Sequence, residues 1–361
     1  MNDCLPKSPF FSIIVPCCDV EPYVRECLDS VLKQPFTAWE CIIGVETSKD
    51  NTEAIVREYA ANDARFKVFT GPRSGSCSAS RNTGIDMAQG EYIIFLDGDD
   101  TIAEGSLQRL HDKIAARPGA DIYPYAMLVH NEMTDKDEPT RDNYPADFDG
   151  ELTGPKATVM VYRHQQNPCP MLQLSVFRRE FLLANDLKCI HGLRRQDSEF
   201  SPRARFLAQR VIPLHDPFYL YRIQMSSVGS SARGPGYFHR DWAIILRSLL
   251  AFHAKVSAER GFNSRISEYW ARHWTQLIFF FWFSPQNINR IPRALRLETL
   301  ETLFDHGFND FNLLIAATPQ KSKRLLAWWL ILFIRCPSMR TLSEWFFKGY
   351  FFLAGLKHNG E

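Results

Sequence analysis

Four residues, Asp97-Gly98-Asp99-Asp100, carry the strongest chemical signal in the chain. They directly follow five apolar residues, Tyr92 to Leu96, which are typical of a buried strand. Carboxylates clustered where such a strand emerges repel one another and lose hydration, and a divalent cation sharing the site with a diphosphate would offset that cost. Hard oxygen ligands favour Mg²⁺ or Mn²⁺. By itself the run also fits a turn, because Asp-Gly is a common turn pair and the acids could cap a helix near Ala103.

Arg81 and Asn82 precede this run and suit phosphate chemistry. Both fall near the start of a predicted helix at residues 78–88. An arginine there supplies a fixed fork of donors for diphosphate oxygens. The alternative is an arginine on an exposed helix face, which is a common place for this residue type.

The elements that must position these residues alternate between strand and helix up to about residue 100. Short β-branched or aromatic runs predict strands, and apolar residues at helical spacing predict helices. We expect strands at residues 11–15, 39–45, 66–69 and 92–96, the first ended by Pro16, and helices at 20–33, 51–61 and 78–88, the second capped by Asp50. This order predicts an α/β fold with a mostly parallel sheet flanked by helices on both faces. Ligands of such sheets bind beyond the carboxyl ends of the strands.

The remainder of the chain divides near residue 230. Residues 104–222 are less regular, with a polar stretch at 131–149 that predicts a loop and a strand-like segment at 217–223. A Gly/Ser-rich link at 229–236 is followed by helical patterns only, including a stripe formed by Trp242, Ile245, Leu246 and Leu249. We therefore expect an α/β domain at residues 1–230 and an all-helical C-terminal domain at residues 231–361.

The composition excludes several classes of protein. The chain has 361 residues and a formal net charge of +1, which gives no basic field for nucleic acid and no acidic excess typical of disorder. Its nine cysteines form no C-x-x-C pair, which favours reduced thiols in the cytoplasm over structural zinc or disulfides. The N-terminus lacks a secretory signal pattern, and the longest apolar runs are shorter than the ~20 residues of a membrane span. We expect a cytoplasmic protein that binds no nucleic acid.

Several motifs in unbroken order connect the first 105 residues to a known family. The segment from Ser12 to Thr101 resembles the nucleotide-binding half of the family 2 glycosyltransferases, which have the GT-A fold, here of the bacterial cell-surface polysaccharide type. The matching segments are Ser12-Ile13-Ile14-Val15-Pro16, Cys27 to Gln34, Ser78 to Ile85 and Gly90 to Asp100. Linked motifs at the right spacing favour a site over a turn at Asp97 to Asp100. The resemblance implies that residues 1–230 form a GT-A catalytic domain.

The resemblance assigns roles on the donor side of the site. It implies that Asp97 positions the nucleotide ribose, that Asp99 coordinates the metal ion, and that Gly98 lies between them. Arg81 and Asn82 would bind the diphosphate. The base pocket would be formed by Pro16, Cys17, Asp19 and Glu21, although Asp19 and Glu21 also suit charge pairing with a helix N-terminus.

The base-reading side departs from the family pattern. The family usually ends its second strand with two aspartates and a glycine, whereas this chain has Val45-Glu46-Thr47. Glu46 falls on the position whose acid typically reads the uracil edge and keeps a carboxylate one methylene longer. Cys17-Cys18 stands where the family often has Tyr-Asn, so the stacking area on the base is reduced.

A second group of residues resembles the acceptor side of the family. The family has a motif in which a Glu-Asp pair precedes a helix, and the segment Gln196-Asp197-Ser198-Glu199-Phe200 resembles it. In inverting members of the family the aspartate of this pair is the general base. Asp197 matches that aspartate. Gln196 replaces the glutamate, which removes a negative charge beside the base and should leave its pKa lower. The alternative is that Asp197 only caps a helix starting near Ser198.

The C-terminal region carries aromatic residues with basic flanks from Lys321 onward. Such a pattern suits an interfacial helix lying on an anionic leaflet, and equally a helical bundle packed on the catalytic domain or on a second subunit. Residues 231–361 would therefore serve membrane-surface association, at the inner face of the cell membrane, or homo-oligomerisation.

The function implied by the resemblance is a metal-dependent, inverting glycosyltransferase. It would be a hexosyl- or N-acetylhexosaminyltransferase that moves a sugar from a nucleotide-diphosphate donor, with UDP as the expected nucleotide, to a hydroxyl of a glycan or lipid-linked acceptor, as in capsule or lipopolysaccharide assembly. A sugar-1-phosphate nucleotidyltransferase shares the sheet type but needs a Gly-rich basic loop, which Pro16-Cys17-Cys18-Asp19 does not supply. A catalytically degenerate donor-binding or scaffold protein of a polysaccharide assembly complex stays open because of the changes at Val45 and Gln196.

Overall fold

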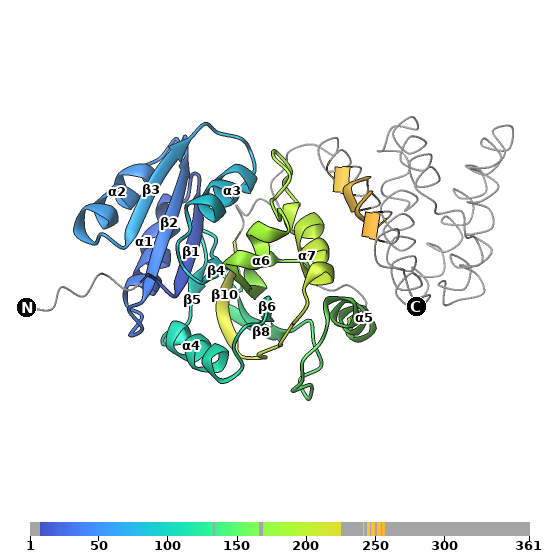
Figure 1. The fold of residues 1–361 in the computed structure, drawn as a ribbon. Coiled ribbons are helices and arrows are strands. Elements are labelled where there is room, and N and C mark those ends of the chain that lie inside the picture. Colours follow the sequence, from blue (N-terminus) through green and yellow to red (C-terminus); the bar gives the residue numbers. More distant parts are fainter. Residues whose placement is uncertain are drawn as a thin grey trace, which may run out of the picture. The chain divides into compact units, whose positions relative to one another are not determined.

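The chain divides into two compact units, residues 1–231 and 232–361. The computed structural model describes residues 8–132, 134–165 and 169–224, together with residues 241, 244–245, 247–249, 251–253 and 255–256, which are helical (Figure 1). Ile245 and Leu249 are buried there, whereas Trp242, Leu246 and the aromatic segment from Lys321 onward lie outside the described residues. The roles predicted for residues 231–361 therefore stay predictions.

A six-stranded sheet forms the centre of the first unit, with the strand order β3-β2-β1-β4-β9-β6. Its first four strands are parallel, and β9 runs antiparallel to both β4 and β6. This arrangement confirms the predicted mostly parallel α/β sheet. The strands are β1 (Phe11–Cys17), β2 (Trp39–Glu46), β3 (Phe66–Gly71), β4 (Tyr92–Phe95), β6 (Ile122–Pro124) and β9 (Ser175–Arg178).

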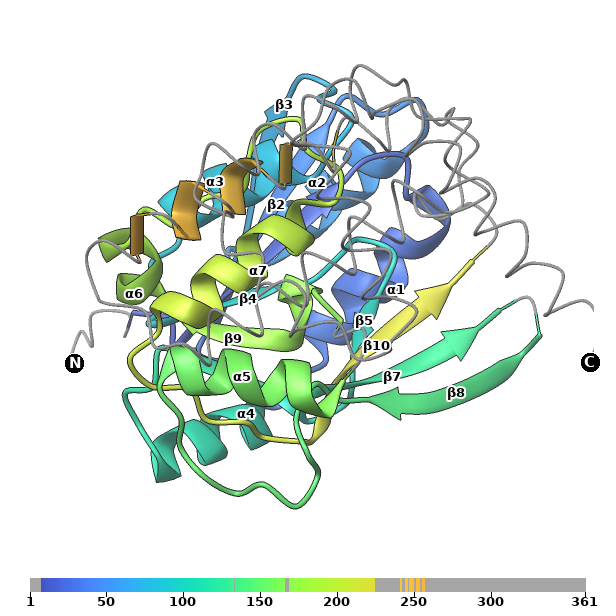
Figure 2. The same cartoon turned by 90° about the vertical axis from the view of Figure 1, so that its right-hand side faces the viewer.

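Helices cover both faces of this sheet (Figures 1 and 2). On β1, Ile13 and Val15 belong to the core shared with α1, α2 and α4, while Ile14 belongs to the core shared with α3, α5, α6 and α7. The alternation follows from the two-residue period of a strand. The helices are α1 (Glu21–Leu32), α2 (Thr52–Asn62), α3 (Ser78–Met87), α4 (Ser106–Ala116), α5 (Gly154–His164), α6 (Arg179–Ala184) and α7 (Gln196–Leu207), and a 3₁₀ turn, η1, spans Leu172–Leu174.

A second, four-stranded sheet has the order β5-β10-β7-β8 and lies beside the first (Figure 2). It consists of β5 (Thr101–Ile102), β7 (Ala126–Asn131), β8 (Lys136–Arg141) and β10 (Pro217–Ile223). The strand predicted at 217–223 is confirmed as β10. The loop predicted at 131–149 is wrong in part, because β8 pairs with β7 at the sheet edge, where backbone hydrogen bonds form without an apolar side-chain pattern.

Two local predictions also need correction. Pro16 does not end β1, because the strand continues to Cys17 and pairs with β2 through Cys17 and Val45. Asn51, not Asp50, precedes the first residue of α2, although the Asp50 carboxylate still accepts a hydrogen bond from the Thr52 N–H at 3.1 Å. Such differences of one residue arise because several polar side chains near a helix start can bind its free N–H groups.

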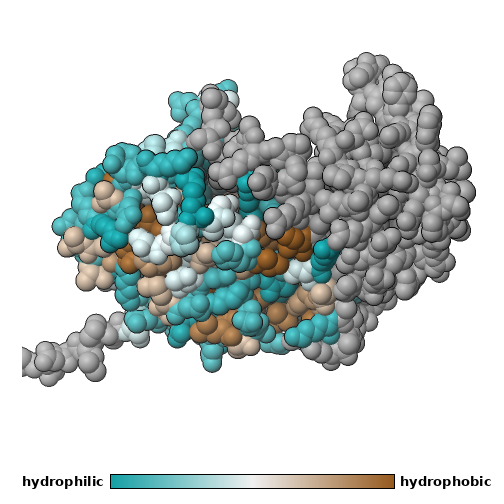
Figure 3. Space-filling model, turned by 90° about the horizontal axis from the view of Figure 1, so that it is seen from above, coloured by the Kyte–Doolittle hydropathy of each residue, from teal (hydrophilic) through white to brown (hydrophobic). Residues whose placement is uncertain are grey.

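The surface of the described part carries few large apolar side chains. On the face shown in Figure 3, hydrophilic residues predominate and hydrophobic residues form separate small groups. Among the described residues, Leu32 and Leu183 are the large hydrophobic side chains that count as exposed. No helix within the described ranges is both long and apolar enough to cross a membrane.

Gly154 allows α5 to pack against the end of α7. A Cβ atom at this position would lie 2.5 Å from the Phe206 carbonyl oxygen, 2.7 Å from that of Ala208 and closer still to that of Arg205. Backbone atoms cannot move aside as a flexible side chain can. We therefore predict that Gly154→Ala lowers the free energy of unfolding by about 1–3 kcal/mol, measured by chemical denaturation. Gly71→Ala is the matched control, since a Cβ there meets nothing within 4 Å; equal effects of the two substitutions would contradict the packing argument.

Candidate functional site

The candidate site lies where the chain reverses its direction of sheet growth. From β1 the strands proceed outward through β2 to β3, and the chain then returns to place β4 on the other side of β1. In such sheets the crevice beyond the carboxyl ends of the two strands at the reversal is the usual ligand site. Pro16 and Cys17 are the last two residues of β1, and Asp97 comes two residues after β4, so the structure brings these predicted residues to the carboxyl ends of the two strands.

Asp97, Asp99 and Asp100 form a compact carboxylate cluster. One ligand oxygen of each lies within 4.8 Å of the others. Burial, with the Asp97 charge as the next cause, raises the pKa of Asp99 to about 6, and burial also raises the pKa of Asp100 well above its usual range. The Asp100 N–H donates to the Asp97 carbonyl oxygen at 3.0 Å, so a turn is present as well. The turn alone does not explain why three acids crowd into a partly buried volume.

The Asp97 carboxylate is held by one donor on each oxygen. The Arg81 guanidinium from α3 binds Oδ1. The Gln173 amide from η1 donates to Oδ2 at 2.6 Å. Arg81 is only 3% exposed, which contradicts the alternative of a surface arginine and leaves it facing the acidic cluster.

Strand β10 supplies the partners of the other two acids. The Tyr219 hydroxyl donates to Asp100 Oδ2 at 2.5 Å, and the Arg222 N–H donates to Asp100 Oδ1 at 2.8 Å. Gln224 Nε2 donates to Asp99 Oδ2 at 2.7 Å. No carboxylate of the cluster caps a helix near Ala103, because α4 begins at Ser106 without a side-chain cap.

Gly98 lies closely against the end of β1. A Cβ at this position would be 2.9 Å from Cys17 Sγ and 3.2 Å from the Pro16 carbonyl oxygen. The Cys17 side chain is 2% exposed and packs in the core, where burial raises the pKa of its thiol. Cys17 is therefore a buried residue that packs against Gly98, and the structure does not expose its side chain as the predicted base contact.

Asp19 and Glu21 connect the loop after β1 to the loop after β2. Asp19, at φ 53°, accepts from the Lys49 N–H at 2.7 Å and pairs with Arg73 at 2.6 Å, and the Lys49 hydrogen bond is the main cause that lowers its pKa. Glu21 accepts from the Asn51 N–H at 2.9 Å and from its side-chain amide at 2.8 Å. Both carboxylates thus have partners within the protein beside any role toward a ligand.

Glu46 ends β2 with its carboxylate turned to the loop before α3. It is 5% exposed and accepts from the Ser74 hydroxyl at 2.5 Å and the Ser74 N–H at 2.9 Å. The neighbouring Val45 is buried in the opposite core with Cys17. The two-residue period of β2 explains why only Glu46 reaches this side of the sheet.

Asn82 and Asp197 belong to the same part of the site. The Asn82 amide donates to the Cys189 carbonyl oxygen and accepts from the Cys189 N–H, both at 2.8 Å, so it holds the segment that leads into α7. Asp197 lies in the first turn of α7, which begins at Gln196, two residues before the predicted start near Ser198. Its carboxylate accepts from the Ser198 N–H at 2.8 Å, and burial raises its pKa despite the nearby Arg81 and Arg195.

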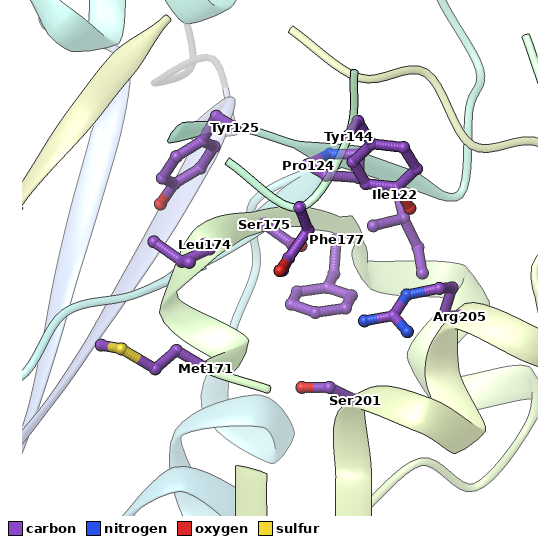
Figure 4. A pocket seen from close by; sticks show the side chains of 11 residues that line it. Ile122, Pro124, Tyr125, Tyr144, Met171, Leu174, Ser175, Phe177, Ser201 and Arg205 are labelled. Atoms are coloured by element: carbon purple, nitrogen blue, oxygen red, sulfur yellow. The ribbon is translucent and has the colours of Figure 1, made fainter. Parts of the chain in front are cut away.

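A small pocket is lined by residues of β6, η1, β9 and α7 (Figure 4). It measures about 20 Å³, room for about one water molecule, so it cannot hold a nucleotide sugar. Met171 and Leu174 line one part of it, and Ser201 and Arg205 of α7 line another. The acidic cluster beyond the carboxyl end of β4 is therefore the better candidate for a ligand site.

Sequence reasoning missed Gln173, Tyr219 and Gln224 as members of the site. Tyr219 lies in the strand predicted at 217–223, but a strand pattern does not mark a residue as part of a site. Gln173 and Gln224 carry no signal of a site either, because they are single amides separated from their acidic partners by 76 and 125 residues.

The raised pKa of Asp99 predicts a pH-dependent stability of the metal-free protein. An unfolded aspartate has a pKa near 3.9, so the contribution of Asp99 to wild-type stability should fall as pH rises from about 4 to about 6 and remain lower above that range. We predict that Asp99→Asn is more stable than wild type by on the order of 2–3 kcal/mol at about pH 8 in chelator, and that this gain vanishes near pH 4. Chemical denaturation across pH measures it, and a less stable variant at about pH 8 would contradict the assignment.

Comparison with known proteins agrees with this geometry. A sequence model described as Glycosyl transferase family 2 matches residues 12–183. The uncharacterized glycosyltransferase EpsJ of Bacillus subtilis is 32% identical over 61% of this chain and 63% of its own length. EpsH of the same organism, which is also named as a glycosyltransferase, is 30% identical over 73% of this chain and 72% of its own length. The match thus spans just under two thirds of EpsJ.

The fold has a counterpart among solved structures. The crystal structure of S. aureus TarS 1–349 in complex with UDP gives a TM-score of 0.69 at 20% identity, over 94% of this chain and 91% of TarS. The TarS complex with UDP-GlcNAc gives a TM-score of 0.68 at the same identity. At this level of identity the likeness establishes the fold.

Proposed function

Since this chain belongs to the family 2 glycosyltransferases and has their GT-A fold, we propose that it transfers a sugar from a nucleotide-diphosphate donor to a hydroxyl of a glycan or lipid-linked acceptor. The observation that carries the proposal is the carboxylate cluster at the crevice between β1 and β4, with the buried Arg81 on one of its members. A cation-binding group and a fixed guanidinium side by side suit a diphosphate leaving group.

The residues of the cluster fit a divalent metal ion. Their donor atoms are all carboxylate oxygens, which suit Mn²⁺ or Mg²⁺, and the raised pKa of Asp99 reflects a charge cost that a cation would offset. Asp99 would be the main ligand, whereas Asp97, paired with Arg81, would position the ribose. When bound, the metal ion would neutralise negative charge on the departing diphosphate.

The remaining donor-side residues act in two ways. Arg81 binds the diphosphate, and the packing of Gly98 against Pro16 and Cys17 holds the acidic cluster at the end of β1. Asp19, Glu21 and Asn82 shape it by holding its loops, as their hydrogen bonds within the protein indicate. Glu46 faces the nucleobase position, and its carboxylate oxygens retain acceptor capacity beyond the bonds from Ser74. TarS, which shares the fold, was crystallised with UDP, and this favours UDP as the nucleotide.

Asp197 is the proposed general base. The acceptor hydroxyl gives its proton to the Asp197 carboxylate while its oxygen attacks the anomeric carbon, and the bond to the diphosphate breaks with its electron pair on the leaving oxygen. A single displacement of this kind inverts the anomeric configuration. Burial raises the pKa of Asp197, which makes it a stronger base than an exposed aspartate.

The class of sugar has support from a related structure, whereas the acceptor has none. A hexose or N-acetylhexosamine is supported by the UDP-GlcNAc complex of TarS. A cell-surface polysaccharide acceptor, action at the inner face of the cell membrane and a homo-oligomer remain predictions from the resemblance.

Nucleotide binding tests the donor assignment. We predict that UDP with Mn²⁺ raises the melting temperature of the chain, because ligand at a hundredfold excess over Kd adds about 2.7 kcal/mol to the free energy of unfolding. UDP without Mn²⁺ should raise the melting temperature by a much smaller amount. A panel with GDP, ADP, CDP and dTDP-type diphosphates serves as control for the base, and Asp99→Asn serves as control for the metal. If no diphosphate shifts the melting temperature, the scaffold alternative replaces the enzyme.

Loss of the base tests the mechanism separately. We predict that Asp197→Asn lowers the transfer rate by about 10²–10⁴-fold, because the acceptor hydroxyl loses its proton acceptor. Calorimetric binding of UDP with Mn²⁺ should remain close to wild type in the same variant. Full transfer activity in Asp197→Asn would refute the base assignment and leave the donor assignment intact.

A further inference from the structure

Gln173 is a buried polar residue whose chemistry the proposed roles do not account for. It lies in η1 between Leu172 and Leu174, which are 1% and 2% exposed, and is itself 5% exposed. Its Nε2 donates to Asp97 Oδ2 at 2.6 Å, while its Oε1 is buried and has no hydrogen-bond partner among the described residues. A buried acceptor without a partner destabilises the fold.

An apolar residue at this position would avoid that cost. A methionine of similar length would fill the same space without an unpaired polar atom. Asp97 Oδ2 would lose a donor, but the Asp97 side chain is 25% exposed and can be hydrated. The amide therefore stabilises the fold no better than an apolar side chain would. Its distinctive contribution is the hydrogen bond that it donates to Asp97.

The chemistry of the amide suits a carboxylate that must keep one orientation. With Arg81 on Oδ1 alone, the carboxylate could rotate about its terminal torsion, which is broad for aspartate. A second donor on Oδ2 removes that freedom. A neutral amide does so without cancelling the negative charge of the cluster, which a lysine would do, and without adding a fourth carboxylate.

The backbone around Gln173 is itself fixed. The Tyr125 hydroxyl donates to the Gln173 carbonyl oxygen at 2.5 Å, and Leu172 and Leu174 are anchored in the two hydrophobic cores on opposite faces of the sheet. The position of the amide is thus set before any ligand binds, and a group held in advance loses less entropy on binding.

We propose that Gln173 is a positioning residue that fixes the Asp97 carboxylate for binding of the nucleotide diphosphate. The proposal rests on the donor-binding function assigned above. A positioning role differs from a structural role in a measurable way, because loss of the amide should weaken donor binding without lowering the stability of the fold.

The test compares two buried glutamines in the full-length chain. Gln34 is also 5% exposed, but its amide donates to Ser30 and Ala103 and accepts from Leu107, so all of its polar atoms are paired within the fold. Gln173→Met should weaken calorimetric binding of UDP with Mn²⁺ by about 10-fold or more, with an unchanged or higher melting temperature. Gln34→Met should lower the melting temperature and leave the UDP affinity of the folded protein unchanged.

A second variant of the same shape keeps the test decisive. Gln173→Glu preserves the size of the side chain and replaces the donor by a carboxylate, so it should weaken UDP binding at least as much as Gln173→Met. A loss of melting temperature in Gln173→Met that matches Gln34→Met, or wild-type UDP affinity in both Gln173 variants, would overturn the positioning role while leaving the donor assignment intact. If the unsubstituted chain does not bind UDP with Mn²⁺, the donor assignment fails, and the proposal for Gln173 fails with it.

Discussion

Crowding of three carboxylates at the end of β4 is the constraint on which the rest of the site depends. Asp97, Asp99 and Asp100 follow a buried strand and cannot separate, so each needs donors from elsewhere in the protein. Those donors come from α3, η1 and β10, and their side chains or backbone N–H groups reach the cluster from three directions. The packing of α3, η1 and β10 against the end of β4 supplies these hydrogen-bond donors.

The second sheet has its clearest role in this context. β5 follows the acidic cluster directly and pairs with β10, which places Tyr219 and Arg222 against Asp100 and Gln224 against Asp99. Asp100 is 1% exposed and fully engaged by these partners, so it is a structural member of the cluster. Asp97 and Asp99 retain exposure and are the acids that a ligand can reach. Asp100 thus serves the fold, whereas Asp97 and Asp99 are accessible for the proposed site.

Hydrogen bonds connect the residues proposed for the donor side to one another's loops. Asp19 and Glu21 bind the loop after β2, Glu46 binds Ser74, and Asn82 binds the backbone at Cys189. The last of these contacts connects the helix that carries Arg81 to the segment that leads to Asp197. A pocket whose walls are already hydrogen-bonded is preorganised, and preorganisation reduces the entropy lost on binding.

Local patterns in the sequence were sufficient for the strands and helices up to Asp100, for the acidic cluster and for the first turn of α7, because strand alternation, helical spacing and linked motifs are properties of neighbouring residues. The same patterns could not reveal β8, a polar edge strand paired through its backbone, nor that Cys17 and Val45 turn into the core while Glu46 turns toward Ser74. Gln173 and Gln224 became visible only in the tertiary structure. Their partners lie 76 and 125 residues away, and no spacing rule relates an amide to a carboxylate across such a distance; only the packing of η1 and β10 against the end of β4 brings them together.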